Sequence, residues 1–172
     1  MTGWDRDVES WIVAHRIGFL NDPFRWLTYA GTQGAIWLVV ALAVAVSTRR
    51  AQVLVAVAAA DLVADVTTTG LQALFGRSRP LVATLVARPH SHSFPSGHAA
   101  TSFACAVVLG ALSPALRRTA LGLAALIAFS RLYVGVHYPL DVLAGSAYGA
   151  LVGLAVVRLV SSWTARGRSH AR

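Results

Sequence analysis

Two histidines and a carboxylate have the residue types and spacing that phosphoryl transfer needs. His137 and Asp141 lie four positions apart with Pro139 between them, so one helical turn brings the carboxylate within reach of one imidazole nitrogen. The carboxylate would fix the tautomer of the ring and leave the other nitrogen free to attack phosphorus. His98 supplies a second imidazole that could protonate the leaving group. These three residues form a candidate catalytic set.

Neighbouring residues are of types that bind phosphate. Arg79 and Arg131 flank the histidine segments, and the rigid arginine fork suits a tetrahedral oxyanion. Ser96 and Gly97 come directly before an apolar helical run, so backbone N–H groups and the helix dipole can hold an anion there. Glycine also lets the backbone come close to a ligand. These segments can therefore bind an anion beside His98.

The elements that must position these residues are those of a membrane protein. The 172 residues are 56% hydrophobic and only 13% charged, whereas a soluble domain usually carries about 25% charged residues. A membrane-spanning helix needs about 20 apolar residues, and five stretches meet that need. They are residues 27–48, 51–75, 97–115, 117–136 and 139–160. Their alternation brings the candidate residues near the same membrane face.

The predicted fold is an all-α integral membrane bundle of about five transmembrane helices. Residues 4–20 mix tryptophans with several charges, which is typical of an amphipathic helix in the membrane interface. We expect an N-terminal interfacial segment at residues 1–26, a transmembrane domain at residues 27–160 and a basic cytoplasmic tail at residues 161–172.

The distribution of charge predicts the orientation. The net charge of +8 comes entirely from arginine, because the sequence contains no lysine. The arginines form short clusters between apolar runs, which fits the positive-inside rule better than a nucleic-acid groove. We expect the side with Arg49, Arg50, Arg117, Arg118 and the tail to be cytoplasmic. The candidate site then faces the periplasm or exterior, and the alanine-rich, lysine-free composition suggests a bacterial cell membrane.

The second apolar stretch carries an unusual polar face. Asp61, Asp65, Thr68 and Gln72 share one side of a helix with 3.6 residues per turn. Ionisable groups inside a membrane usually face a bundle interior or a wet cavity. The face therefore predicts either a polar network between helices or a wall that shapes and hydrates the active site.

Two of these segments resemble the motifs of a known family. Residues 94–100 are FPSGHAA and residues 130–141 are SRLYVGVHYPLD. They match the Pro-Ser-Gly-His and Ser-Arg-x5-His-x3-Asp motifs of the type 2 phosphatidic acid phosphatases, whose superfamily includes glucose-6-phosphatase and vanadium haloperoxidases. The resemblance covers roughly residues 50–160, and it implies a phosphatase that works through a phosphohistidine.

The resemblance also implies a role for each matching residue. His137 would be the nucleophile and Asp141 its orienting partner, and His98 would protonate the leaving group and then activate water. The phosphoryl oxygens would be held by Arg79, Arg131, Ser96 and the backbone of Gly97. The family uses no metal and no cofactor. His90 and His92 lie in a polar loop, and we expect them to act as loop or lid residues.

The sequence departs from the family at one position. The family has lysine seven residues before the arginine of its first motif, where this chain has Gln72. A charged hydrogen bond is worth about 1.5–3 kcal/mol against about 1 kcal/mol for a neutral one, so the expected loss in rate is about 5–30-fold. Arg77 lies on the same loop and could supply the missing charge, so we include Gln72 and Arg77 among the candidate phosphate-binding residues.

The predicted function is metal-independent hydrolysis of a lipid phosphomonoester or diphosphate. The small size and outward-facing site favour a polyprenyl diphosphate such as undecaprenyl diphosphate, with phosphatidylglycerophosphate and phosphatidate as close rivals. The expected partners are this lipid phosphate and the bilayer, without nucleic acid, and the oligomeric state stays open.

Two other functions remain open. An inactive relative that binds lipid phosphates or scaffolds partners is favoured by Gln72 and opposed by the presence of His98, His137 and Asp141. A transporter would use Asp61 and Asp65, but the small number of spans and the lack of an inverted repeat argue against it.

Overall fold

The computed structural model describes residues 3–169, except for the side chains of Gln33 and of residues 163–169. Every regular element in this range is helical, which confirms the predicted all-α fold. The helices are α1 (Gly3–Ala14), α2 (Asn21–Ala30), α3 (Ala35–Thr48), α4 (Ala51–Phe75), α5 (Gly97–Leu112), α6 (Arg117–Tyr133) and α7 (Pro139–Ser169). Short 3₁₀ turns occupy Gly18–Leu20, Thr32–Gly34 and Pro114–Leu116.

Helices lie at all five predicted spans, but they differ in length. By length and composition, α4 and residues 139–162 of α7 can cross a membrane, and α2 with α3 can form a third span bent by 67°. α5 is apolar but shorter, with 16 residues, and α6 has 17. Among the described residues, two or three spans therefore have full length, and α5 and α6 are shorter helices at the positions of the other predicted spans.

The first predicted span is broken by a glycine-flanked turn. The turn at Thr32–Gly34 separates α2 from α3, and Gly34 has a φ of 67°. A side chain is strained at this φ, and a Cβ there would also collide with the carboxylate of Asp61. The break brings the end of α2 beside the start of α5, where Thr32 meets His98.

Close packing of α5 against α7 brings two of the motif segments together. Gly145, Gly149 and Gly153 repeat every four residues on α7 and lie against the backbone of α5. A Cβ on Gly153 would lie 2.7 Å from the carbonyl oxygen of Ala104, and one on Gly149 would overlap that of Ala100. Small residues at this spacing let membrane helices approach closely. The N-terminus of α5 is thereby held next to the N-terminus of α7.

The predicted N-terminal helix is present, but its buried face is acidic. Asp5 and Glu9 of α1 are fully buried, whereas Trp4 and Trp11 are 54% and 61% exposed. The helix ends at Ala14, earlier than the predicted residue 20. The acidic face is turned inward because Asp5 contacts Arg77 and the start of α7.

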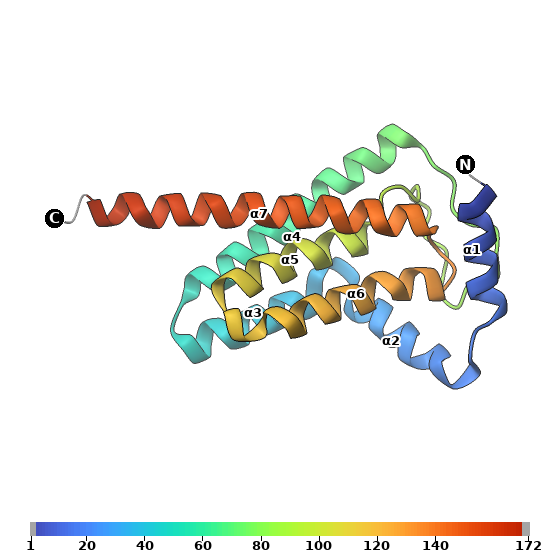
Figure 1. Cartoon of the computed structure of the whole chain (residues 1–172), viewed down its shortest axis with the longest axis horizontal. Helices are drawn as coiled ribbons and strands as arrows, with labels where there is room; N and C mark the ends of the chain where they lie inside the picture. The colour runs from blue at the N-terminus through green and yellow to red at the C-terminus, as the bar shows by residue number, and fades with distance from the viewer. Residues whose placement is uncertain (1–2, 170–172) are drawn as a thin grey trace.

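Different loops lie at the two ends of the bundle (Figure 1). The turns that carry Arg49–Arg50 and Arg117–Arg118 lie at one end, whereas α1 and the loop at residues 76–96 lie at the other. α7 extends past residue 160 to Ser169, so part of the predicted tail continues the last helix. Residues 170–172 of that tail lie outside the described residues.

Candidate active site

The predicted motif residues meet around one cavity at the end of the bundle that carries α1. The cavity has a volume of about 220 Å³ and opens between α4, α5 and the turn at Thr32–Gly34. It contains six of the nine residues that the sequence predicted for the site. These are Gln72, Arg79, Gly97, His98, Arg131 and His137.

His137 is almost fully buried, and its two ring nitrogens face different partners. Nδ1 faces Oδ2 of Asp141 at 3.5 Å, which is longer than an ordinary hydrogen bond. Nε2 lies 3.0 Å from Nη1 of Arg79, which can only donate. Nε2 therefore carries the lone pair, and the proton belongs on Nδ1 facing the carboxylate.

The surroundings of His137 keep its ring neutral. Burial, together with the cations of Arg79 and Arg131, lowers the pKa of His137 to about 4, although Asp141 opposes the shift. At neutral pH the ring is therefore uncharged, which is the form that can attack phosphorus.

Arg79 is held rigidly by the loop and by the segment before His137. Its Nε donates to the carbonyl of Ser91 at 2.8 Å, and its Nη2 donates to Ser91 Oγ at 3.0 Å and to the carbonyl of His92 at 3.1 Å. Nη1 donates to the carbonyl of Val136 at 2.9 Å. Burial lowers the pKa of Arg79 to about 10, so the guanidinium remains charged at neutral pH. The polar loop thus supports Arg79 through two backbone carbonyls and one hydroxyl.

Arg131 and Ser96 present buried donors without partners among the described residues. Nε of Arg131 and Oγ of Ser96 make no hydrogen bond, although the two residues are 3% and 0% exposed. Buried polar atoms are normally satisfied, so both are suited to an anion. The backbone N–H of Ser96 is engaged, because it donates to the carbonyl of Asp141 at 2.9 Å.

His98 is positioned by the break between α2 and α3. Its Nε2 lies 3.5 Å from Oγ1 of Thr32, and its ring also hydrogen-bonds the backbone of Thr28. Gly31 packs against the same ring, since a Cβ there would lie 3.4 Å from Cδ2 of His98. The glycines of this turn are visible in the sequence, but their contact with His98 can be found only from the fold.

Gln72 supports the Pro-Ser-Gly-His segment directly. Its Nε2 donates to the carbonyl of Pro95 at 2.9 Å, and its side chain is buried on the cavity wall. Gln72 therefore fixes the turn that starts α5 while also lining the cavity.

The polar face of α4 divides between the two predicted roles. Asp65, Thr68 and Gln72 line the cavity, as expected for a wall that shapes the site. Asp61 instead lies against Gly34 and accepts a weak hydrogen bond from the thiol of Cys105, at 3.8 Å. The Oγ1 of Thr68 is buried and has no partner among the described residues.

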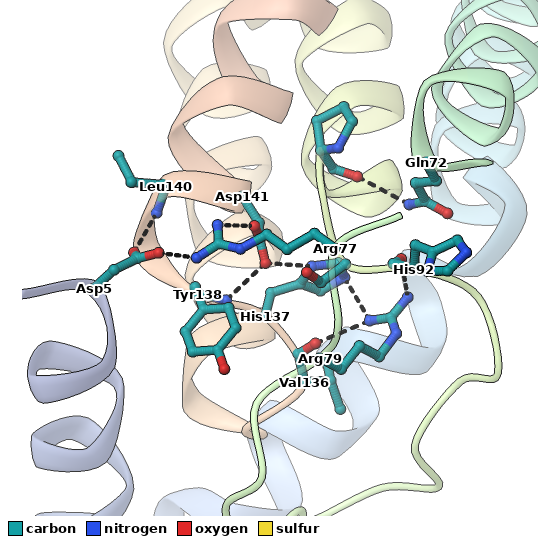
Figure 2. A network of polar contacts seen from close by, with 12 residues as sticks. Asp5, Gln72, Arg77, Arg79, His92, Val136, His137, Tyr138, Leu140 and Asp141 are labelled. Carbon is teal, nitrogen blue, oxygen red and sulfur yellow. Dashed lines mark hydrogen bonds and ion pairs between the residues drawn. The ribbon is translucent and has the colours of Figure 1, made fainter. Parts of the chain in front are cut away.

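Arg77 does not occupy the predicted phosphate-binding position. Its guanidinium bridges Asp5 and Asp141, and its Nη1 lies 2.5 Å from Oδ1 of Asp141 (Figure 2). It also lies over the ring of Tyr138, at 4.4 Å from the centroid. Burial lowers the pKa of Arg77, but the hydrogen bonds and charges of the two carboxylates raise it above the ordinary value. Arg77 is thus a partner of Asp141, and Asp5, which the sequence did not identify, contacts the same network.

A second cavity of about 350 Å³ lies beneath α1 and shares Arg79 with the first. Glu9 lines it, and neither carboxylate oxygen of Glu9 has a hydrogen-bond partner among the described residues. Burial raises the pKa of Glu9 to about 8, against the lowering effect of Arg16. Within residues 3–169, no group of three or more potential metal ligands is close enough to hold a metal ion.

Comparison with known proteins identifies a family and related sequences. The sequence model of the PAP2 superfamily matches residues 50–165. A decaprenylphosphoryl-5-phosphoribose phosphatase of Mycobacterium tuberculosis is 39% identical over 157 residues, covering 86% of this chain and 82% of the relative. An undecaprenyl-diphosphatase of Sulfolobus acidocaldarius is 42% identical over 77 residues, covering 44% of this chain and 37% of the relative.

Two crystal structures share the fold. The transmembrane PAP2 type phosphatidylglycerolphosphate phosphatase from Bacillus subtilis has a TM-score of 0.77 and 24% identity, over 92% of this chain and 85% of that one. Aquifex aeolicus LpxE has a TM-score of 0.73 and 26% identity, over 88% of this chain and 93% of that one. The family match begins next to α4, so α1, α2 and α3 precede it.

Proposed function

Because the chain belongs to the PAP2 superfamily, we propose that it removes the terminal phosphate of a polyprenyl-linked sugar phosphate through a phosphohistidine on His137. The chain is a membrane protein and a lipid phosphatase by its family and relatives. One observation carries the assignment to His137: the lone pair of Nε2 faces a cavity that also holds Arg79, Arg131 and His98.

The first chemical step forms a bond between Nε2 of His137 and phosphorus. The bond between phosphorus and the leaving oxygen breaks, and His98 donates a proton to that oxygen. Nη1 of Arg79 exchanges its contact with Nε2 for a hydrogen bond to one phosphoryl oxygen, and Arg131 and Ser96 donate to the other phosphoryl oxygens. Asp141 stabilises the positive charge that the ring acquires.

The second step restores the enzyme. His98, now neutral, takes a proton from water as the water oxygen attacks phosphorus. The bond between phosphorus and Nε2 breaks, and inorganic phosphate leaves. His137 and His98 are then in their starting protonation states, and the net reaction is hydrolysis of the phosphate ester.

The cavity wall on α4 favours a hydroxyl-bearing leaving group. Asp65, Thr68 and Thr69 line the cavity alongside Thr32, and these residues accept or exchange hydrogen bonds with sugar hydroxyls. The second phosphate of a polyprenyl diphosphate would instead approach the carboxylate of Asp65. The name of the mycobacterial relative supports the same substrate class. Undecaprenyl diphosphate is the second candidate, supported by the name of the archaeal relative.

We place the site on the outer side of a bacterial cell membrane. The arginine pairs lie at the opposite end of the bundle from α1 (Figure 1), and clustered arginines mark the cytoplasmic side. In this orientation α1 would lie in the outer interface with Trp4 and Trp11 toward the lipid.

The test is phosphate release by the purified protein in detergent with excess chelator. The substrates are decaprenylphosphoryl-5-phosphoribose, undecaprenyl diphosphate, phosphatidylglycerophosphate and phosphatidate, each beside His137→Ala. We expect fastest release from the first, none in the variant, and an acid-labile radiolabel on wild-type protein. Folded wild-type protein that neither releases phosphate nor takes up label would instead support a lipid-phosphate binder or scaffold.

A further inference from the structure

We propose that Asp5 on α1 is a positioning residue for the pair formed by His137 and Asp141, and that it acts through Arg77. The proposal rests on the proposed function in one respect, since that function makes His137 the nucleophile. Figure 2 shows the chain of contacts from α1 to the histidine.

Arg77 is the central member of this chain. One terminal nitrogen donates to Oδ2 of Asp5, and the other donates to Oδ1 of Asp141 at 2.5 Å. The ring of Tyr138 covers one face of the guanidinium. A planar fork with one nitrogen on each carboxylate has little freedom to turn. The position of Arg77 is therefore set by Asp5 as much as by Asp141.

Asp5 also holds the start of α7. Its second oxygen, Oδ1, accepts the backbone N–H of Leu140 at 3.0 Å. Leu140 is the residue before Asp141, in the first turn of the helix. One carboxylate on α1 thus contacts both the partner of Asp141 and the backbone that carries Asp141.

The contacts of Asp141 explain how the contacts of Asp5 affect His137. Its Oδ1 is taken by Arg77, while its Oδ2 accepts the N–H of Tyr138 at 2.9 Å and faces Nδ1 of His137 at 3.5 Å. Both carboxylates are fully buried, and the side chain of Arg77 is 15% exposed. In such surroundings an ion pair that loses one member rearranges, because an unpaired buried charge is costly.

The charge on Asp5 also determines how strongly the negative charge of Asp141 acts on the ring of His137. With Asp5 present, one guanidinium is shared between two carboxylates, so the cluster keeps a net negative charge beside the ring. Without that charge, Arg77 neutralises Asp141 alone. Asp141 then stabilises the positively charged ring of the phosphohistidine less well, and turnover slows while phosphate binding through Arg79 and Arg131 is unchanged.

α1 precedes the segment that the family match covers. This positioning contact is therefore supplied by an element that lies outside residues 50–165. The opposite face of α1 carries exposed Trp4 and Trp11, so the same helix that holds Arg77 also presents aromatic residues outward.

The test compares Asp5→Asn with Asp7→Asn in the full chain. Asp7 is on the same helix but exposed, so its variant controls for loss of an acidic residue from α1. We expect Asp5→Asn to lower kcat by about 10–100-fold, the range found when the outer partner of a metal-binding histidine is removed, with KM changed less than about twofold. Asp7→Asn should match wild type, and Asp5→Glu should restore part of kcat.

A second readout does not depend on turnover. In protein with ¹⁵N-labelled histidine, Asp5→Asn should move the ring signals of His137, and Asp7→Asn should leave them in place. If Asp5→Asn does not fold, Arg77→Lys serves instead, because an ammonium cannot bridge two carboxylates with a fixed fork. Unchanged His137 signals together with kcat within twofold of wild type would overturn the proposal. Failure of wild type to release phosphate would count against the proposed function alone, because the spectra still decide on Asp5.

Discussion

Nη1 of Arg79 lies 3.0 Å from Nε2 of His137, the nitrogen that faces the cavity. The cation that would bind the phosphoryl group therefore contacts the lone pair that would attack it. A phosphate entering the cavity can take over this donor, which frees the lone pair at the moment when the substrate is in place.

The first prediction concerns pH. Burial and the nearby arginines lower the pKa of His137 to about 4 from an ordinary value of 6.5. The reactive neutral ring is populated above the lowered pKa, so the acid limb of kcat/KM, where activity falls because His137 becomes protonated, should be centred near pH 4. The measurement is kcat/KM from pH 3.5 to 8 in detergent. An acid limb centred near 6.5 would contradict the buried, arginine-flanked environment of His137.

The second prediction concerns Gln72. Gln72→Lys places a cation on the cavity wall where the family has lysine, and we expect kcat/KM to rise by about 5–30-fold. Gln72→Ala removes the hydrogen bond to the carbonyl of Pro95, so we expect kcat/KM to fall. Steady-state kinetics of both variants provide the check. A loss of activity in Gln72→Lys as large as that in Gln72→Ala would mean that the bond to Pro95 outweighs the added charge.

The parts of the site that follow from local spacing were predictable from sequence. His137 and Asp141 are one turn apart, and Ser96 and Gly97 precede an apolar helix, so their relationships hold in any fold that keeps those helices. The five helical stretches followed from apolar runs in the same way. The break at Thr32–Gly34 was missed because hydropathy alone does not register two glycines within an apolar run.

The contacts between segments that are distant in the sequence could not be predicted from local spacing. Arg79 is held by backbone carbonyls of Ser91 and His92, and every residue type has a carbonyl. Asp5 and Asp7 look alike in the sequence, and only the packing of α1 distinguishes the buried carboxylate from the exposed one. Arg77 was assigned to phosphate because its charge was visible and its two carboxylate partners were not.

The third prediction concerns the contact between α5 and α7. Gly149→Ala puts a Cβ onto the backbone carbonyl of Ala100, and overpacking of this kind costs about 1–3 kcal/mol. Gly122→Ala is the matched control, because a Cβ on that helical glycine meets nothing within 4 Å. Thermal unfolding in detergent should show a lower Tm for Gly149→Ala and an equal or higher Tm for Gly122→Ala. Equal Tm values for both variants would mean that the two helices can separate without cost.

The fourth prediction concerns Glu9. Burial raises the pKa of Glu9 to about 8 from an ordinary value of 4.5, so the folded state binds a proton that the unfolded state releases between these values. Stability from this residue is therefore complete below pH 4.5 and is lost as pH rises through 8. Glu9→Gln keeps the shape without the ionisation, so its Tm should exceed that of wild type at pH 8 and match it at pH 4.5. A difference that does not change with pH would exclude ionisation of Glu9 as the cause.

The last prediction concerns substrate selection by the α4 wall. The side chain of Asp65 lines the cavity, where a carboxylate would accept hydrogen bonds from sugar hydroxyls and repel a second phosphate. Asp65→Asn should lower kcat/KM for decaprenylphosphoryl-5-phosphoribose and raise it for undecaprenyl diphosphate. We expect the ratio of the two to change by about tenfold, which corresponds to about 1.4 kcal/mol. Asp22→Asn is the control, because Asp22 is exposed and paired with Arg25 on α2. If kcat/KM for both substrates changes equally in Asp65→Asn, the side chain affects the cavity as a whole. Other residues then determine the preference for a sugar phosphate or a diphosphate.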